Sequence, residues 1–249
     1  MEKNYCHGSK INMLATDLDG TLVGSRRALA ELNRQIISKM KDFLLVYTTG
    51  RIFSSAWQLI LEENLLYPDV LITDVGTEIY LGPRFGREQA WEDKMLEDWD
   101  PVKTAAVVES AGGLKRQEVH PRFRLSYYAE RGSFGETVAR LIQAVQEAGL
   151  PVKVVPSLNH IIDVVPGKAG KGPALCHLRQ MFNMKKENTF VCGDSGNDLS
   201  MFLNGFRGIV VGNASRELVD ALKHHGEVYF SRAYFASGIM EGLKRYGIL

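Results

Sequence analysis

The stretch INMLATDLDGT, residues 11–21, joins a short apolar run to two carboxylates and a Gly-Thr turn. The run from Ile11 to Ala15 has the length and composition of a buried strand. Asp17 and Asp19 follow it only two positions apart, where their like charges repel each other. Acidic pairs of this kind are also common in solvated loops, so the meaning of this pair depends on what the chain places beside it.

Strand-like and helix-like segments alternate in the first third and in the last third of the chain. Before residue 81 we predict a helix over 26–41, a strand over 43–48, a helix over 53–64 and a strand over 70–73. The alternation returns after Gly170, with helices over 171–182, 198–203, 215–224 and 237–246 and strands over 189–192 and 208–211. This order is typical of a parallel α/β sheet.

The middle third of the chain breaks this alternation. It contains turn clusters, one amphipathic helix over 134–148 and β-rich pieces over 123–129, 152–155 and 161–165. Mixed segments of this kind indicate a separate α+β module. We therefore predict an α/β fold in which residues 1–81 and 167–249 form a Rossmann-like parallel sheet core, with an α+β cap inserted at residues 82–166.

Composition narrows the class of protein. The chain has 249 residues, 45% apolar and 24% charged, and a formal net charge of +1. This balance gives no reason to expect nucleic acid or an anionic membrane as a partner. Three widely separated cysteines fit a reducing compartment better than a disulfide framework. The polar N-terminus and the short apolar runs predict a cytoplasmic protein without a membrane span, and a monomer is the default expectation.

Four polar clusters follow predicted strands or open predicted helices. They are Asp17 with Asp19, the segment TTGR at 48–51, the segment GKG at 170–172 and the segment GDSGND at 193–198. Ligands of parallel α/β sheets bind at the carboxyl ends of the strands. We therefore expect these clusters to converge on one site.

The residue types in these clusters point to phosphoryl chemistry. A divalent cation with oxygen ligands, such as Mg²⁺, allows several carboxylates to share a site, and Asp17 and Asp194 are its natural ligands. A carboxylate can attack phosphorus to form an aspartyl phosphate, a role we assign to Asp17, while Asp19 serves as the acid and base. The ammonium of Lys171 and the hydroxyl of Thr49 would neutralise and bind phosphate oxygens, although Thr49 could instead cap the following helix.

These motifs, in this order, resemble the four motifs of the haloacid dehalogenase superfamily: DLDGT, TTGR, the lysine of GKGPAL and GDSGND. The α+β insert after the third strand resembles the subgroup with a large cap. Within it the chain is most similar to the sucrose-phosphate phosphatase family, through VYTTGR, VGTEIY, FRLSYY, VCGDSGND and GIVVGNASREL. The resemblance implies a phosphatase acting on a sugar phosphate, with sucrose 6-phosphate the leading substrate.

The resemblance also implies roles for individual residues. Mg²⁺ would be held by the Asp17 carboxylate, the Asp19 backbone carbonyl and Asp194. Asn197 and Asp198 would orient water and Lys171. Candidates for substrate binding are Gly50, Arg51, Glu78, Arg124, Ser126, Tyr127 and Asn159.

Two alternatives remain open at this point. The substrate could be a hexose phosphate, a glycosyl-glycerate phosphate or another disaccharide phosphate, because the cap sets this choice. The protein could also be a non-catalytic sugar-phosphate sensor on the same fold. Intact Asp17, Asp19, Lys171 and Asp194 argue against a sensor, which needs no nucleophile.

Overall fold

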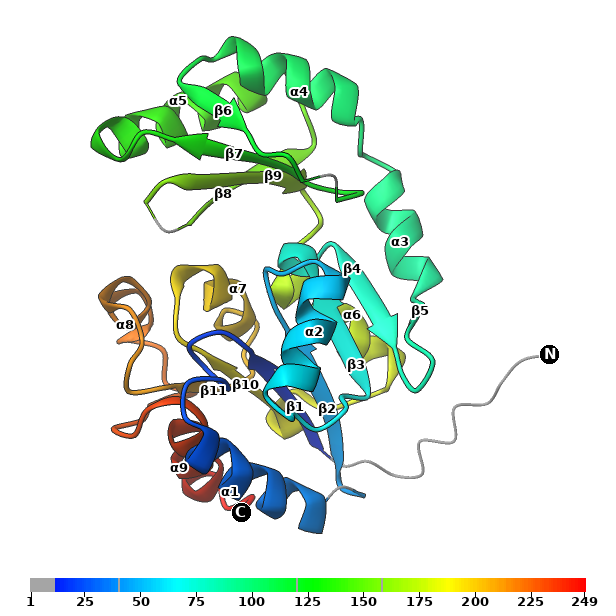
Figure 1. Ribbon diagram of the computed structural model, residues 1–249, viewed down its shortest axis with the longest axis vertical. Coiled ribbons are helices and arrows are strands. Elements are labelled where there is room, and N and C mark those ends of the chain that lie inside the picture. The colour runs from blue at the N-terminus through cyan, green and yellow to red at the C-terminus, as the bar shows by residue number, and fades with distance from the viewer. Residues whose placement is uncertain (1–11, 40, 120, 158) are drawn as a thin grey trace, which may run out of the picture.

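The structure is a computed structural model that describes residues 12–39, 41–119, 121–157 and 159–249. Residues 1–11 of the predicted core, which include Ile11 and one of the three cysteines (Cys6), and residue 40 of the helix predicted over 26–41 lie outside these ranges. The described chain folds into a larger α/β body and a smaller α+β body stacked on it (Figure 1). This arrangement confirms the predicted fold class.

The larger body is built on a sheet that has eight strands among the described residues, in the order β12-β11-β10-β1-β2-β3-β4-β5. The strands are β1 (Asn12–Asp17), β2 (Phe43–Thr48), β3 (Val70–Thr73), β4 (Glu78–Leu81), β5 (Gly86–Arg87), β10 (Thr189–Gly193), β11 (Arg207–Val210) and β12 (Val228–Phe230). The run from β12 to β3 is parallel, and β4 and β5 are antiparallel additions at one edge. The central strands are buried on both faces, which is why they read as continuous apolar runs.

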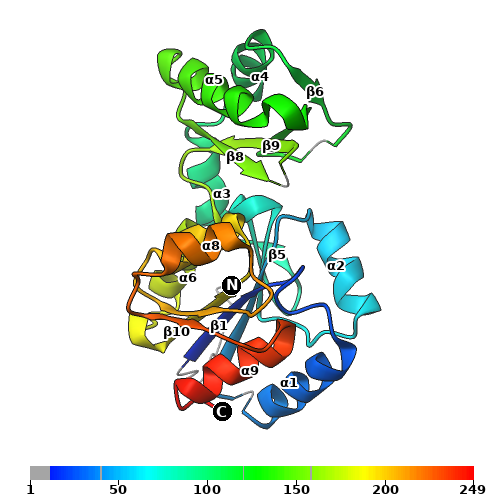
Figure 2. The same cartoon turned by 90° about the vertical axis from the view of Figure 1, so that its left-hand side faces the viewer.

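Helices cover both faces of this sheet (Figure 2). One face carries α1 (Arg26–Ser38), α2 (Phe53–Glu62) and α9 (Phe235–Arg245), and the other carries α3 (Gln89–Leu96), α6 (Lys171–Met181), α7 (Leu199–Phe202) and α8 (Arg216–Leu222). Alternate residues of β1 supply the two cores: Leu14 packs with the first group, and Met13 and Ala15 with the second. Fully burying one such leucine or methionine stabilises the fold by about 1.5–3 kcal/mol.

The smaller body has an antiparallel sheet in the order β6-β7-β9-β8. Its elements are α4 (Pro101–Ser110), β6 (Leu114–Arg116), β7 (Leu125–Ala129), α5 (Phe134–Glu147), β8 (Val152–Ser157) and β9 (Ile161–Pro166). Both helices lie on the side of this sheet that faces away from the larger sheet (Figure 1). A core that includes Tyr127, Leu141 and Ile162 joins the layers. The opposite side of this sheet, which carries no described helix, therefore faces the larger body (Figure 1).

Two helices, α3 and α4, were not expected from apolar spacing. Each begins with an acidic N-cap. Glu88 accepts hydrogen bonds from the backbone N–H groups of Ala90 and Trp91, at 3.3 and 2.6 Å. Asp100 caps α4 in the same way, and Pro101 occupies its first turn. Each helix buries only a few side chains, so in the sequence its N-cap residue indicates the helix more clearly than its apolar spacing does.

The structure also bears on where the two bodies meet. Strand β5 falls inside the predicted insert but pairs with β4 in the larger sheet. Trp91, Met95 and Phe123 likewise pack into the core beneath that sheet. The limits 82–166 for the cap stay a prediction. None of the described helices has both the length and the apolar character that a membrane crossing requires.

Candidate active site

The parallel pairing of β1 with both β10 and β2 brings the motif residues together. Thr16 pairs with Cys192 and Asp17 with Thr48, so the three strands end at the same edge. Asp17 is the last residue of β1, and Asp194 directly follows β10. The sequence segments predicted to converge therefore do lie at one edge of the sheet.

Lys171 links these segments through its side chain. Its Nζ lies 2.6 Å from Oδ1 of Asp17, 2.6 Å from Oδ1 of Asp198 and 3.1 Å from Oδ1 of Asn197. The side chain is almost fully buried at the start of α6. Burial by itself lowers the pKa of this ammonium, but the charges of Asp17 and Asp198 outweigh it and raise the pKa above its usual value. Lys171 therefore stays protonated.

Asp198 holds both Lys171 and the loop after β10. It closes a short 3-10 turn, Gly196–Asp198, and its Oδ2 accepts from the backbone N–H groups of Asp194 and Ser195, at 3.0 and 3.1 Å. Its other oxygen binds Lys171. Asp198 is therefore placed to orient Lys171 rather than to face the substrate, in line with the role that the family resemblance implies.

A cluster of carboxylates could hold a cation. One oxygen each of Asp17, Asp194 and Asp198 lies within 4.8 Å of the others. Burial raises the pKa of Asp17 well above its ordinary value and that of Asp194 to about 6. Charged carboxylates are thus costly at this place unless positive charge is added. Hard oxygen donors suit Mg²⁺, and the residues present fit such an ion.

The turn after β1 packs tightly against Asp194. Thr21 Oγ1 donates to Oδ1 of Asp194 at 2.6 Å. Gly20 has a φ of +83°, and a Cβ built there would lie 2.7 Å from Oδ2 of the same aspartate. A side chain at position 20 would therefore displace Asp194, which explains in physical terms the glycine of DLDGT.

Asp19 and Thr49 are both engaged with Arg51. Nε and Nη2 of Arg51 each donate to one carboxylate oxygen of Asp19, at 2.7 Å. The hydroxyl of Thr49 accepts from the backbone N–H of Arg51 at 3.1 Å. Thr49 does not cap α2, because the N-cap of that helix is Ile52. Thr49 instead fixes the turn that aims Arg51 at Asp19.

A cleft of about 540 Å³ opens over this cluster, between the two bodies. Among the predicted site residues its walls include Asp17, Asp19, Thr49, Gly50, Arg51, Asn159, Asp194 and Asn197. Six lining residues were not predicted: Pro156, Ser157, Ser195, Gly196, Ser215 and Glu217. Pro156, Ser157 and Asn159 come from the smaller body, so that body forms one wall of the cleft. Ser195 and Gly196 belong to the quoted motif GDSGND, and Ser215 and Glu217 belong to GIVVGNASREL, but none of the four was predicted as a site residue.

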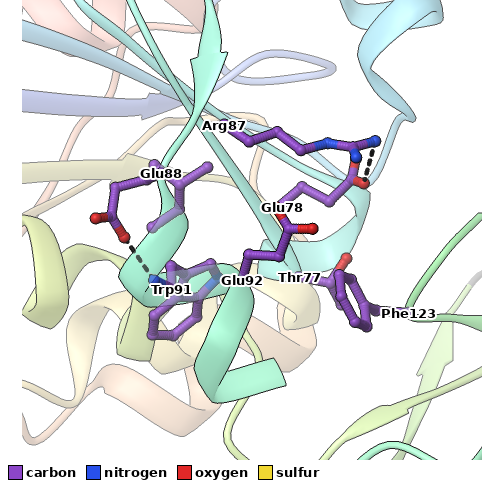
Figure 3. A pocket seen from close by; sticks show the side chains of 8 residues that line it. Thr77, Glu78, Arg87, Glu88, Trp91, Glu92 and Phe123 are labelled. Atoms are coloured by element: carbon purple, nitrogen blue, oxygen red, sulfur yellow. Dashed lines mark hydrogen bonds and ion pairs between the residues drawn. The ribbon is translucent and has the colours of Figure 1, made fainter. Parts of the chain in front are cut away.

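The other substrate candidates lie away from this cleft. Glu78 lines a separate cavity of about 10 Å³ between β4 and α3, where it pairs with Arg87 at 3.5 Å (Figure 3). Ser126 donates to Asp163 at 2.6 Å, and the hydroxyl of Tyr127 donates to Glu109 at 3.2 Å. These three residues are occupied by partners elsewhere, so their predicted contact with substrate stays a prediction.

The α/β body with a buried Asp–Lys–Asp cluster at its strand ends, beneath an α+β body, defines a phosphatase of the haloacid dehalogenase type. A solved structure of the same fold is the haloacid dehalogenase-like hydrolase protein yhjK from Bacillus subtilis, with a TM-score of 0.70 at 18% identity, covering 97% of this chain and 95% of that one. Residues 10–247 match the sucrose-6F-phosphate phosphohydrolase family, and the chain belongs to that family. It is thus a phosphoric monoester hydrolase by class, which confirms the resemblance seen in the sequence.

Relatives within the family differ in the substrates they are named for. The mannosylfructose-phosphate phosphatase of Agrobacterium fabrum is 33% identical, over 96% of this chain and 98% of the relative. The probable sucrose-phosphatase 2 of Arabidopsis thaliana is 31% identical over 94% of this chain, which spans only 59% of that longer protein. The structure of the sucrose-phosphatase from Synechocystis sp. PCC6803, in complex with sucrose and phosphate, has a TM-score of 0.87 at 31% identity and covers 96% of this chain and 98% of that one.

Proposed function

We propose that this protein is a Mg²⁺-dependent phosphatase that hydrolyses a phosphorylated disaccharide, with sucrose 6-phosphate as the leading substrate. The observation that carries the proposal is the buried contact of Lys171 with Asp17 and Asp198, in which Asp17 also lines the cleft between the two bodies. The named substrates of its relatives supply the sugar.

The proposed reaction proceeds in two displacements. A carboxylate oxygen of Asp17 attacks phosphorus, the bond from phosphorus to the sugar oxygen breaks, and Asp19 donates a proton to the leaving oxygen. Asp19 then removes a proton from water. That water attacks the aspartyl phosphate, and inorganic phosphate leaves as the Asp17 carboxylate is restored. Arg51, paired to both oxygens of Asp19, holds this carboxylate at the cleft wall between the steps.

Positive charge for the phosphoryl oxygens has two proposed sources. Lys171 is protonated and touches Asp17 directly. A bound Mg²⁺, held by Asp17, Asp194 and the backbone carbonyl of Asp19, would supply the remaining charge. The raised pKa of Asp194, about 6 because of burial, supports this assignment, since a buried carboxylate of this kind is stabilised by a neighbouring cation.

The rest of the cleft suits an uncharged sugar. Ser157 and Asn159 from the smaller body and Ser195 and Ser215 from the larger one offer hydroxyl and amide groups. Such groups both donate to and accept from sugar hydroxyls. A volume of about 540 Å³ lies within the range of small-molecule sites. The cytoplasmic location and the monomeric state remain predictions from the sequence.

The test is phosphate release from a panel of sugar phosphates, each with Mg²⁺ and with a chelator. We expect turnover of sucrose 6-phosphate to exceed that of hexose phosphates and to disappear on chelation. A preference for mannosylfructose phosphate would instead favour the second candidate, which the 33% identity to the Agrobacterium relative supports. Binding without turnover across the panel would indicate a sensor. Full activity after chelation would show that the reaction does not require Mg²⁺.

A further inference from the structure

Arg124 joins the two bodies through a single guanidinium. It immediately precedes β7 of the smaller body. Its Nε lies 2.8 Å from Oδ1 of Asp74, and its Nη1 lies 3.5 Å from the backbone oxygen of Gly50, both in the larger body. The same Nη1 lies 3.5 Å from Oδ2 of Asp163 on β9 of the smaller body. The side chain of Arg124 thus contacts two loops of the larger body, at Gly50 and at Asp74, and strand β9 of the smaller body, at Asp163.

The junction formed by Arg124, Asp74 and Asp163 is buried. The side chains of Asp74, Asp163 and Arg124 are 0%, 8% and 12% exposed. Ser126 also donates to Asp163. Separating a buried ion pair leaves a charge without compensation, which costs far more than losing an exposed pair. The contact therefore favours one orientation of the smaller body on the larger one.

On the larger body the junction reaches the loop that lines the cleft. The backbone N–H of Asp74 donates to the carbonyl of Arg51 at 2.8 Å, and that of Val75 donates to the carbonyl of Thr49 at 3.2 Å. The segment Thr49–Arg51 therefore rests on the 3-10 turn Asp74–Gly76, whose first residue is the partner of Arg124.

On the smaller body the junction lies next to the other wall of the cleft. In the antiparallel pairing of β8 with β9, Asp163 is opposite Val155. The next two residues of β8, Pro156 and Ser157, line the cleft. A shift in the position of Asp163 would therefore move Val155, its partner on β8, and with it the neighbouring residues Pro156 and Ser157 that line the cleft.

We propose that Arg124 is a positioning residue that sets the distance between the two walls of the cleft. It would act through Asp74 and Asp163 and not as a ligand of the sugar. The inference rests on the proposed function, because its consequence is the recognition of a large leaving group. A substrate whose leaving group is too small to reach the Pro156–Ser157 wall does not depend on this distance.

The test compares sucrose 6-phosphate with p-nitrophenyl phosphate, a small aryl ester, in steady-state kinetics. For Arg124→Gln we expect the ratio of the two kcat/KM values to fall about tenfold against the wild type, mainly through the KM of the sugar phosphate. Arg116→Gln is the matched control, because Arg116 pairs with Glu109 within the smaller body. It should leave the ratio unchanged.

A double-mutant cycle separates positioning from direct binding. If Arg124 acts through Asp163, Arg124→Gln and Asp163→Asn together should cost less than the sum of the two single changes. Small-angle X-ray scattering without substrate gives an activity-independent result: Arg124→Gln should change the scattering profile and Arg116→Gln should not. If Arg124→Gln does not fold, Arg124→Lys keeps a buried positive charge without the fork that spans three partners.

Several outcomes would overturn the inference. They are an unchanged kinetic ratio, an equal loss with both substrates, additive effects in the cycle, or an unchanged scattering profile. Failure of the proposed function is distinct, because the wild type would then release phosphate from neither ester while the scattering difference persisted.

Discussion

Arg51 donates one hydrogen bond to each carboxylate oxygen of Asp19, with both distances at 2.7 Å. The side chains are 37% and 50% exposed, so the pair adds little to stability. Its effect is geometric, because a fork-to-fork contact fixes the plane of the carboxylate. The residue proposed as acid and base is therefore oriented by a residue of the second motif.

Arg51→Gln tests this orientation. We expect kcat for a sugar phosphate to fall about tenfold, because Asp19 loses its two-point contact. The kcat of Arg51→Lys should lie between those of the wild type and Arg51→Gln, since an ammonium keeps the charge but cannot reproduce the two-point contact. Steady-state kinetics with thermal melting would show reduced turnover at an unchanged Tm. Arg26→Gln, which removes an exposed pair with Glu63, is the control. Equal kcat values for Arg51→Gln and the wild type would refute the assignment.

Asp17→Asn should separate activity from stability. The amide cannot attack phosphorus, so turnover should be lost. Burial raises the pKa of Asp17 well above its ordinary value, because the loss of water penalises the charged carboxylate more than Lys171 stabilises it. The neutral amide should therefore keep or raise the Tm in the presence of a chelator. Wild-type turnover by this variant would place the nucleophile elsewhere, and a large fall in Tm would contradict the electrostatic argument.

Mg²⁺ should stabilise the wild type and not Asp194→Asn. A ligand that binds the folded state at about a hundred times its dissociation constant stabilises it by about 2.7 kcal/mol, which is a shift of several degrees in Tm. Removing Asp194 takes away one of the clustered carboxylates. Thermal melting over a Mg²⁺ titration measures the shift, with Asp220→Asn on the exposed side of α8 as control. An equal shift in Asp194→Asn would exclude this aspartate as a ligand.

The sequence was sufficient for the parallel core because each central strand is a continuous apolar run with a polar segment after it. Parallel strands end at one edge, so Asp17 and Asp194 could be placed together without knowing any side-chain position. Lys171 opens a helix after a long insert, and the order of the motifs was enough to bring it to Asp17. Local pattern and sheet topology agree at these residues, which is why the sequence could predict that they meet at one edge of the sheet.

The cap residues could not be placed in this way. Arg124 lies 50 positions from Asp74 in sequence, and their contact exists only once the two bodies have a defined orientation. Helix α4 was missed because its buried residues, Thr104, Ala105 and Val108, form a weak stripe. The Asp100-Pro101 pair was the available signal, as an N-cap followed by proline in the first turn. Glu217 reaches the cleft through the packing of α8, which no short pattern encodes.

The pH dependence of stability should contain a contribution from Asp74. Burial raises the pKa of this carboxyl to about 6, even though Arg124 opposes the shift. Between its ordinary pKa of 3.8 and about 6, the folded protein holds a proton that the unfolded chain has released, so stability falls as the pH rises through this window. Asp74→Asn removes this proton exchange. The stability of the variant relative to the wild type should therefore rise by about 1 kcal/mol between pH 5 and pH 7. Urea unfolding at both pH values measures the difference, and a difference that stays constant with pH would show that Asp74 is ionised throughout.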